Sequence, residues 1–118
     1  MGSMAEPSIF TRILDGEIPG EIVVDTGTVF AIRDINPQAP LHMLVIPKTE
    51  QYRDVTELAA GDPQLLADIV SVAKQIADDH ANGEYRLVFN NGPSAAQSVF
   101  HVHAHVLGNL EENKLVGF

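Results

Sequence analysis

Three of the five histidines in this 118-residue chain stand at alternate positions: His101, His103 and His105. Because side chains alternate between the faces of a strand, an extended backbone would place all three imidazoles on one face and the small apolar residues between them on the other. An imidazole has an unperturbed pKa of about 6.5, so it can carry protons near neutral pH, attack as a nucleophile or ligate a metal. The pattern therefore predicts a chemically active strand face, with a plain solvated face as one alternative.

Zinc binding is a second alternative for these histidines. Residues two apart on a strand are separated by about 6.6 Å, so His101 and His105 would lie about 13 Å apart and could not both bind one ion at about 2 Å. An adjacent pair could bind zinc with His42 as a third ligand. Because the chain has no cysteine and the histidine strand has no acidic residue, we expect no metal and no required cofactor, and zinc stays open as an alternative.

The segment before the histidines could bind an anion. Gly92 and the small residues up to Ser98 can present backbone N–H groups and a hydroxyl to a phosphate, although an ordinary turn uses the same residue types. A serine hydrolase with Ser94 or Ser98 as nucleophile is a further alternative. It is disfavoured because residues 92–96, Gly-Pro-Ser-Ala-Ala, depart from the Gly-x-Ser-x-Gly motif. Beside three histidines, the segment is best interpreted as a phosphate site.

Five strands and a short N-terminal helix are expected to position these groups. Ser8 is the predicted N-cap of the short helix, which ends near Gly16. Runs of β-branched and apolar residues predict the strands, at residues 21–25, 28–33, 42–46, 85–90 and 100–107.

One long helix is expected between the third and fourth strands. Asp62 and Pro63 form its N-cap and first position, and Asn82 with Gly83 ends it. His80 falls in its last turn, where a cation suits the helix dipole, so we assign it a structural role. The elements together predict an α+β fold, with a five-stranded, largely antiparallel sheet, one long helix and a short N-terminal helix. The apolar residues of the long helix recur at helical spacing and are expected to face the sheet: Leu66, Ile69, Val70, Ala73, Ile76 and Ala77.

Composition narrows the classes of partner. Seven Lys and Arg face 16 Asp and Glu, for a net charge of −9, which argues against nucleic acid or an anionic membrane as a partner. The lack of cysteine and of a signal-peptide pattern favours the cytoplasm. Residues 1–3 are interpreted as a cloning remnant, and residues 4–118 as a single domain.

Residues 97–107, Gln-Ser-Val-Phe-His-Val-His-Ala-His-Val-Leu, resemble the signature of the histidine triad (HIT) family. The resemblance runs from about residue 8 to residue 108 and implies the HIT fold. It is strongest to the small nucleotide-binding branch, the purine nucleoside phosphoramidases. Further matching segments follow the family's order, at residues 8–10, 16–19, 33–40, 42, 44–48 and 90–92.

The resemblance implies hydrolysis of a purine nucleoside 5′-monophosphate joined to an amine or acyl leaving group. His103 would be the nucleophile that carries a transient nucleotidyl group. His105 and Ser98 would contact the phosphate and the leaving group, while His42 and His101 would orient His103 and relay protons. The expected partners are the purine nucleoside monophosphate, its phosphoramidates and a second copy of the chain in a homodimer.

The resemblance also implies which residues bind the nucleotide. Asn90 and the backbone of Gln97, Ser98 and Val99 would complete the phosphate site, and Asp34 would bind the ribose hydroxyls. Apolar residues would enclose the purine, although their spacing alone would assign them to the core: Ile9, Phe10, Ile13, Ile32, Ile35 and Leu44.

Two other functions and three departures from the family pattern stay open. The protein could be a dinucleoside polyphosphate hydrolase, or a nucleotide- or zinc-binding module with little turnover. Ala95 and Ala96 stand where the branch often has glycines, Glu50 stands where it often has histidine, and residues 109–118 do not match its C-terminal tail.

Overall fold

The computed structural model describes residues 6–111 and forms one antiparallel sheet of five strands in the order β1-β2-β3-β5-β4. The cloning remnant expected at residues 1–3 lies outside the described residues, as do residues 112–118 of the divergent tail. The predicted α+β class is confirmed, since every pair of neighbouring strands is antiparallel. The strands are β1 (Ile22–Asp25), β2 (Val29–Arg33), β3 (Leu41–Pro47), β4 (Arg86–Val88) and β5 (Ala104–Gly108).

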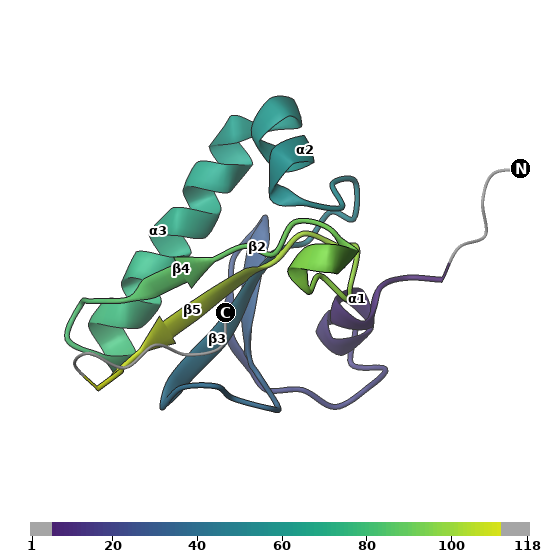
Figure 1. Cartoon of the computed structure of the whole chain (residues 1–118). Helices are drawn as coiled ribbons and strands as arrows, with labels where there is room; N and C mark the ends of the chain where they lie inside the picture. Colours follow the sequence, from purple (N-terminus) through teal and green to yellow (C-terminus); the bar gives the residue numbers. More distant parts are fainter. Residues whose placement is uncertain (1–5, 112–118) are drawn as a thin grey trace, which may run out of the picture.

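The long helix, α3 (Pro63–His80), packs against one face of the sheet (Figure 1). Asp62 caps it as predicted, because its side chain accepts a hydrogen bond from the Leu65 N–H group. The buried face of the helix differs from the predicted one at four residues: Leu65 and Val72 are buried, whereas Leu66 is only partly buried and Val70 is 39% exposed. Helical spacing does not by itself decide which edge of an apolar stripe meets the sheet.

Replacing Ile69 with alanine is expected to lower the free energy of unfolding by about 2–5 kcal/mol, because the side chain is fully buried between α3 and the sheet and its loss leaves a cavity. Val70→Ala, one position along on the exposed side, is the matched control and should cost much less. Urea unfolding of both variants measures the difference. Equal losses would contradict this packing.

The other face of the sheet carries the short N-terminal helix, α1 (Ile9–Leu14), which lies across the sheet from α3 (Figure 1). Ser8 is its N-cap as predicted, with its side chain accepting from the Thr11 N–H group. Phe10 packs with the alternate residues of β2 and β3 that point away from α3, namely Phe30, Ile32, Leu44 and Ile46. Each central strand therefore buries both of its faces.

The last two strands are shorter than the sequence predicted. The strand predicted at residues 100–107 begins only at Ala104, so His101 and His103 precede β5 and only His105 lies within it. The backbone leaves the sheet there, since the Val102 N–H group donates to the Tyr52 carbonyl instead of to β3. The strand predicted at residues 85–90 shortens to Arg86–Val88.

A second helix, α2 (Val55–Gly61), was not predicted. Asp54 caps it, accepting from the Glu57 N–H group at 2.9 Å, so the Asp-x-x-Glu sequence was an available signal. A 3₁₀ turn, Pro93–Ala95, also lies in the segment before the histidines. Within residues 6–111, no helix is both long and apolar enough to cross a membrane.

Candidate active site

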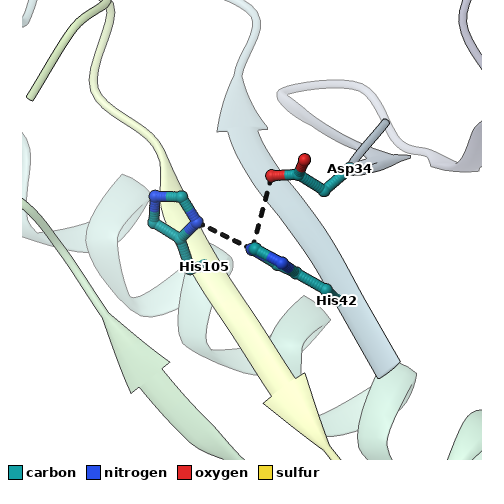
Figure 2. A group of neighbouring side chains, drawn as sticks. All are labelled: Asp34, His42 and His105. Atoms are coloured by element: carbon teal, nitrogen blue, oxygen red, sulfur yellow. Dashed lines mark hydrogen bonds and ion pairs between the residues drawn. The ribbon is translucent and has the colours of Figure 1, made fainter. Parts of the chain in front are cut away.

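Strands β3 and β5 bring His42 and His105 together. The register pairs Leu44 with His105 and His42 with Leu107, so the two histidines lie diagonally on the face opposite α3. Figure 2 shows His42 Nε2 between two partners, His105 Nδ1 at 2.9 Å and Asp34 Oδ2 at 3.4 Å. The predicted meeting of His42 with the histidine segment therefore includes Asp34, which comes from the loop after β2.

The backbone decides the tautomer of His42. Gln38 donates its N–H group to His42 Nδ1 at 3.0 Å, so this nitrogen is unprotonated and the ring proton lies on Nε2. His42 Nε2 then donates to His105 Nδ1, and neutral His105 holds its own proton on Nε2. That nitrogen lies 3.5 Å from Asn90 Nδ2, which is also a donor. The network thus gives His105 a donor at the end away from His42.

His103 carries its proton on Nδ1, the other ring nitrogen from the one protonated in His42 and His105. Its Nδ1 lies 2.9 Å from the His101 carbonyl oxygen, which can only accept, so Nδ1 carries the proton and Nε2 keeps its lone pair. The ring is partly buried between Phe10 and His105, with ring centroids 4.8 Å and 5.3 Å away. A neutral imidazole held in this tautomer has the form that a nucleophile requires.

His101 is 1% exposed, and both of its ring nitrogens are engaged. Its Nε2 donates to the Pro47 carbonyl at 2.7 Å, and its Nδ1 lies 2.5 Å from Ser8 Oγ. The sequence predicted that all three histidines share one chemically active face, but His101 does not line the cavity that His103 and His105 line. Its place is behind the site.

A cavity of about 510 Å³ opens over these histidines. It brings together six of the predicted site residues, Asp34, His42, Asn90, Ser98, His103 and His105. Asn36, Gln38, Ala95 and Ala96 also line it; the first two were not predicted, although they belong to the loop that the family resemblance had marked. Among the described residues, no lysine or arginine lines this cavity.

The six residues expected to enclose a purine separate into two groups. Phe10, Ile32 and Leu44 are buried in the cluster behind His103, with Ile13 packed against it. Ile9 is half-exposed, and Ile35 is 95% exposed in the loop that carries Asp34. None of the six lines the cavity itself, so their contact with a base stays a prediction.

The segment before the histidines is folded around Gln97. This buried side chain accepts from the Gly92 N–H group at 2.8 Å and donates to the carbonyls of Arg53 and Val99 at 2.6 and 3.0 Å. Its own N–H group donates to the Gly92 carbonyl. Gln97 therefore shapes the loop, and Gly92 is needed there because its φ of +101° disfavours other residues.

The N–H groups of Ser98 and Val99 are two donors that this loop does not use itself. Within residues 6–111, their N–H groups donate to no backbone or side-chain acceptor. The Ser98 side chain is exposed and lines the cavity. Ala96 takes a left-handed conformation with φ of +70°, which glycine would adopt more readily. Ala96 therefore keeps the turn and adds strain to it.

Burial lowers the pKa of all four clustered histidines. It is the largest cause at His42, His101 and His103, and at His105 burial together with the neighbouring His103 and His42 lowers the pKa to about 4. Asp34 opposes the shift at His42, His103 and His105. The cluster is therefore neutral at pH 7, and each ring carries its proton on one nitrogen and a lone pair on the other.

Stability is expected to fall as the pH drops below about 6.5. The folded-state pKa values lie below the unfolded value of about 6.5, so the unfolded chain binds more protons in this range and gains population as it does. The loss continues toward the His105 pKa of about 4. Urea unfolding at pH 7.5, 6 and 5 measures it, and His105→Asn should flatten the dependence. A free energy of unfolding that stays constant from pH 7.5 to 5 would contradict the burial of neutral histidines.

Asp34, His42 and His105 could also be considered as metal ligands, since one atom of each lies within 4.8 Å of the others. A metal on His42 Nε2 would move that ring's proton to Nδ1, where the Gln38 N–H group already points. It would also replace the His42–His105 hydrogen bond. The donor set therefore fits a hydrogen-bonded triad better than a zinc site.

The antiparallel sheet and the clustered imidazoles of β3, β5 and the segment before β5 define a histidine triad protein. A model of the HIT domain matches residues 15–112. The chain therefore belongs to the HIT family, which confirms the resemblance found in the sequence. Two relatives and one solved structure illustrate how near the similarity is.

The purine nucleoside phosphoramidase of Escherichia coli K12 is 41% identical over 107 residues, covering 89% of this chain and 89% of the relative. The 14 kDa zinc-binding protein of Zea mays is 42% identical over 111 residues, covering 91% and 85%. A HIT family hydrolase from Clostridium thermocellum superposes with a TM-score of 0.85 at 38% identity, covering 95% of this chain and 98% of the other. The relatives of this chain therefore include hydrolases.

Proposed function

We propose that this protein hydrolyses the bond between a purine nucleoside 5′-monophosphate and an amine or acyl leaving group through a nucleotidyl intermediate on His103. The observation that carries the proposal is the pair of complementary tautomers: a lone pair on His103 Nε2 and a proton on His105 Nε2, on two rings that line one cavity. The similarity to a purine nucleoside phosphoramidase supports the choice of substrate.

In the first step, His103 Nε2 attacks the α-phosphorus and the bond from phosphorus to the leaving group breaks. An amine leaves only if it gains a proton. An anionic phosphate beside His105 raises its pKa from about 4, so this ring takes up a proton from water on binding and delivers one from Nε2. His42 can then turn its Nε2 proton from His105 to Asp34, which lies 3.4 Å away.

In the second step, water attacks the phosphorus of the nucleotidyl-histidine. His105 Nε2, now unprotonated, accepts the proton of the water, and the bond from phosphorus to His103 Nε2 breaks. The nucleoside monophosphate leaves and His105 returns its extra proton to solvent. His101 holds the His103 tautomer through both steps, because its carbonyl accepts the His103 Nδ1 proton.

The remaining predicted residues complete the proposal. Asn90, Ser98 and the N–H groups of Ser98 and Val99 bind the phosphoryl oxygens, where fixed donors stabilise developing charge. The carboxylate of Asp34 binds the ribose hydroxyls, and the exposed Ile35 covers the purine with the other five apolar residues. Gln97 serves through its loop, since its side chain is bonded within the loop and to Arg53.

Two substrates test the proposal against its alternatives. Adenosine 5′-phosphoramidate should be turned over to AMP, and diadenosine polyphosphates should be turned over slowly, because the described cavity offers no lysine or arginine to a long polyphosphate. Faster cleavage of the polyphosphates would favour the dinucleoside polyphosphate hydrolase. Binding of AMP without turnover of either substrate would favour a binding module, and stoichiometric zinc in the untreated protein would favour the zinc-binding one.

A homodimer in the cytoplasm is part of the same proposal. Within residues 6–111, β4 is an edge strand of the sheet, a position at which a strand of a second copy can pair, and Val70 lies exposed on α3. The interface would use α3 and the β4 segment. Sedimentation equilibrium would measure the mass, and a monomer at micromolar concentration would refute the dimer.

A further inference from the structure

Helix α1 lies against His101 and His103 from behind the cavity. The Phe10 ring meets His101 and His103 edge to face, with centroids 5.8 Å and 4.8 Å away and interplanar angles of 62° and 63°. The helix has only six residues, too few to be stable by itself. Contacts outside the helix must therefore decide where Phe10 lies.

Ser8 provides one such contact. Its hydroxyl oxygen accepts from the Thr11 N–H group at 3.2 Å, which caps α1, and lies 2.5 Å from His101 Nδ1. Because the Pro47 carbonyl accepts from His101 Nε2, His101 Nδ1 has the lone pair and Ser8 Oγ donates to it. The same hydroxyl thus starts the helix and donates to His101, whose tautomer the Pro47 carbonyl sets.

Glu50 provides the other contact, from the turn after β3. Its carboxylate accepts from the Ser8 N–H group at 3.2 and 3.3 Å and from the Thr11 hydroxyl at 2.5 Å. These bonds span about 40 residues of sequence and hold the first turn of α1 beside Pro47, where the His101 ring ends. Glu50 is also one of the positions at which the chain departs from the pattern of its branch.

We propose that Ser8 and Glu50 are positioning residues for the His103 nucleophile. Glu50 anchors the start of α1, Ser8 holds the His101 ring in place by donating to its Nδ1, and the His101 carbonyl with the Phe10 ring holds His103. Neither residue lines the cavity, so neither touches the substrate. The role in turnover rests on the proposed function, whereas the hydrogen-bonded chain from Glu50 to His101 can be tested without a substrate.

The test without substrate is ¹⁵N NMR of the histidine rings. In the unaltered protein at pH 7.5, His101 should show a protonated Nε2 and an acceptor Nδ1. Ser8→Ala should shift the Nδ1 signal toward that of a nitrogen without a donor, Ser8→Thr should restore it, and Glu50→Gln should shift it partly. A His101 Nδ1 signal unchanged in Ser8→Ala would overturn the proposal whether or not any substrate is hydrolysed.

The kinetic arm uses adenosine 5′-phosphoramidate. Ser8→Ala and Glu50→Gln are expected to lower kcat roughly tenfold, as for other residues that orient a reacting group through a second one, with KM within about twofold, and Ser8→Thr should recover most of the loss. Glu21→Gln is the matched control, because Glu21 makes an exposed ion pair with Arg33 on β2. Thermal melts confirm that each variant is folded. Unchanged kcat in folded Ser8→Ala, or loss confined to KM, would overturn the positioning role; no turnover by the unaltered protein would overturn the proposed function instead.

Discussion

His103→Ala is expected to lose turnover of adenosine 5′-phosphoramidate, with kcat lowered by roughly 10⁴-fold or more, while AMP still binds. Removing a nucleophile abolishes the covalent route, and the effect on an enzyme of this kind is typically of that size. The other donors of the cavity, Asn90, Ser98 and His105, remain to hold the phosphate. Steady-state kinetics and calorimetric titration with AMP measure the two quantities.

His80→Ala is the matched control for this variant. His80 ends α3, away from the cavity, so its removal should leave kcat within about twofold. Mass spectrometry of rapidly quenched reactions should show a nucleotidyl adduct on the unaltered protein and none on His103→Ala. Turnover near the normal rate in His103→Ala would mean that the nucleophile lies elsewhere.

His105→Asn is expected to have the next largest effect, and the effect should depend on the leaving group. Asparagine keeps a donor but cannot deliver a proton, so kcat for an alkylamine leaving group should fall by roughly 10²–10⁴-fold. For adenosine 5′-phosphorofluoridate, whose fluoride needs little proton assistance, the loss should be far smaller. The ratio of the two losses therefore isolates proton delivery from simple contact with the phosphate.

Ser98→Ala is the control for that comparison, since Ser98 lines the same cavity and cannot protonate a leaving group at neutral pH. It should slow both substrates by a similar factor. A His105→Asn variant that also slows both substrates equally would show that His105 acts only as a binding group, and the first step would then need another proton donor.

Local pattern was enough to predict the architecture and several of the residues that line one cavity. Alternation placed three imidazoles on one side of the backbone and Val102 and Ala104 on the buried side, and the structure keeps that division even where His101 and His103 precede β5. Ser8 and Asp62 cap the helices that they were expected to cap. Both kinds of signal act within a few residues, so they can be found in sequence alone.

The boundary of β5 and the buried face of α3 were decided by packing instead. His101 Nε2 bonds the Pro47 carbonyl and Val102 bonds Tyr52, so the chain leaves the sheet before Ala104. Val72 and not Val70 is buried for a similar reason, because the sheet sets the contact line on the helix. The residues that make these contacts are far in sequence from His101, Val102 and Val72.

The sequence alone determined which groups could do chemistry: three alternating imidazoles, His42 and a loop of small residues with a serine. Only the tertiary structure decided what state each group is in. The Gln38 N–H group and the Pro47 carbonyl set the tautomers of His42 and His101, the Ser8 hydroxyl donates to His101, and Asp34 joins His42 from another loop. A ring's proton goes to the nitrogen that faces an acceptor, and those partners come from segments that only folding brings together.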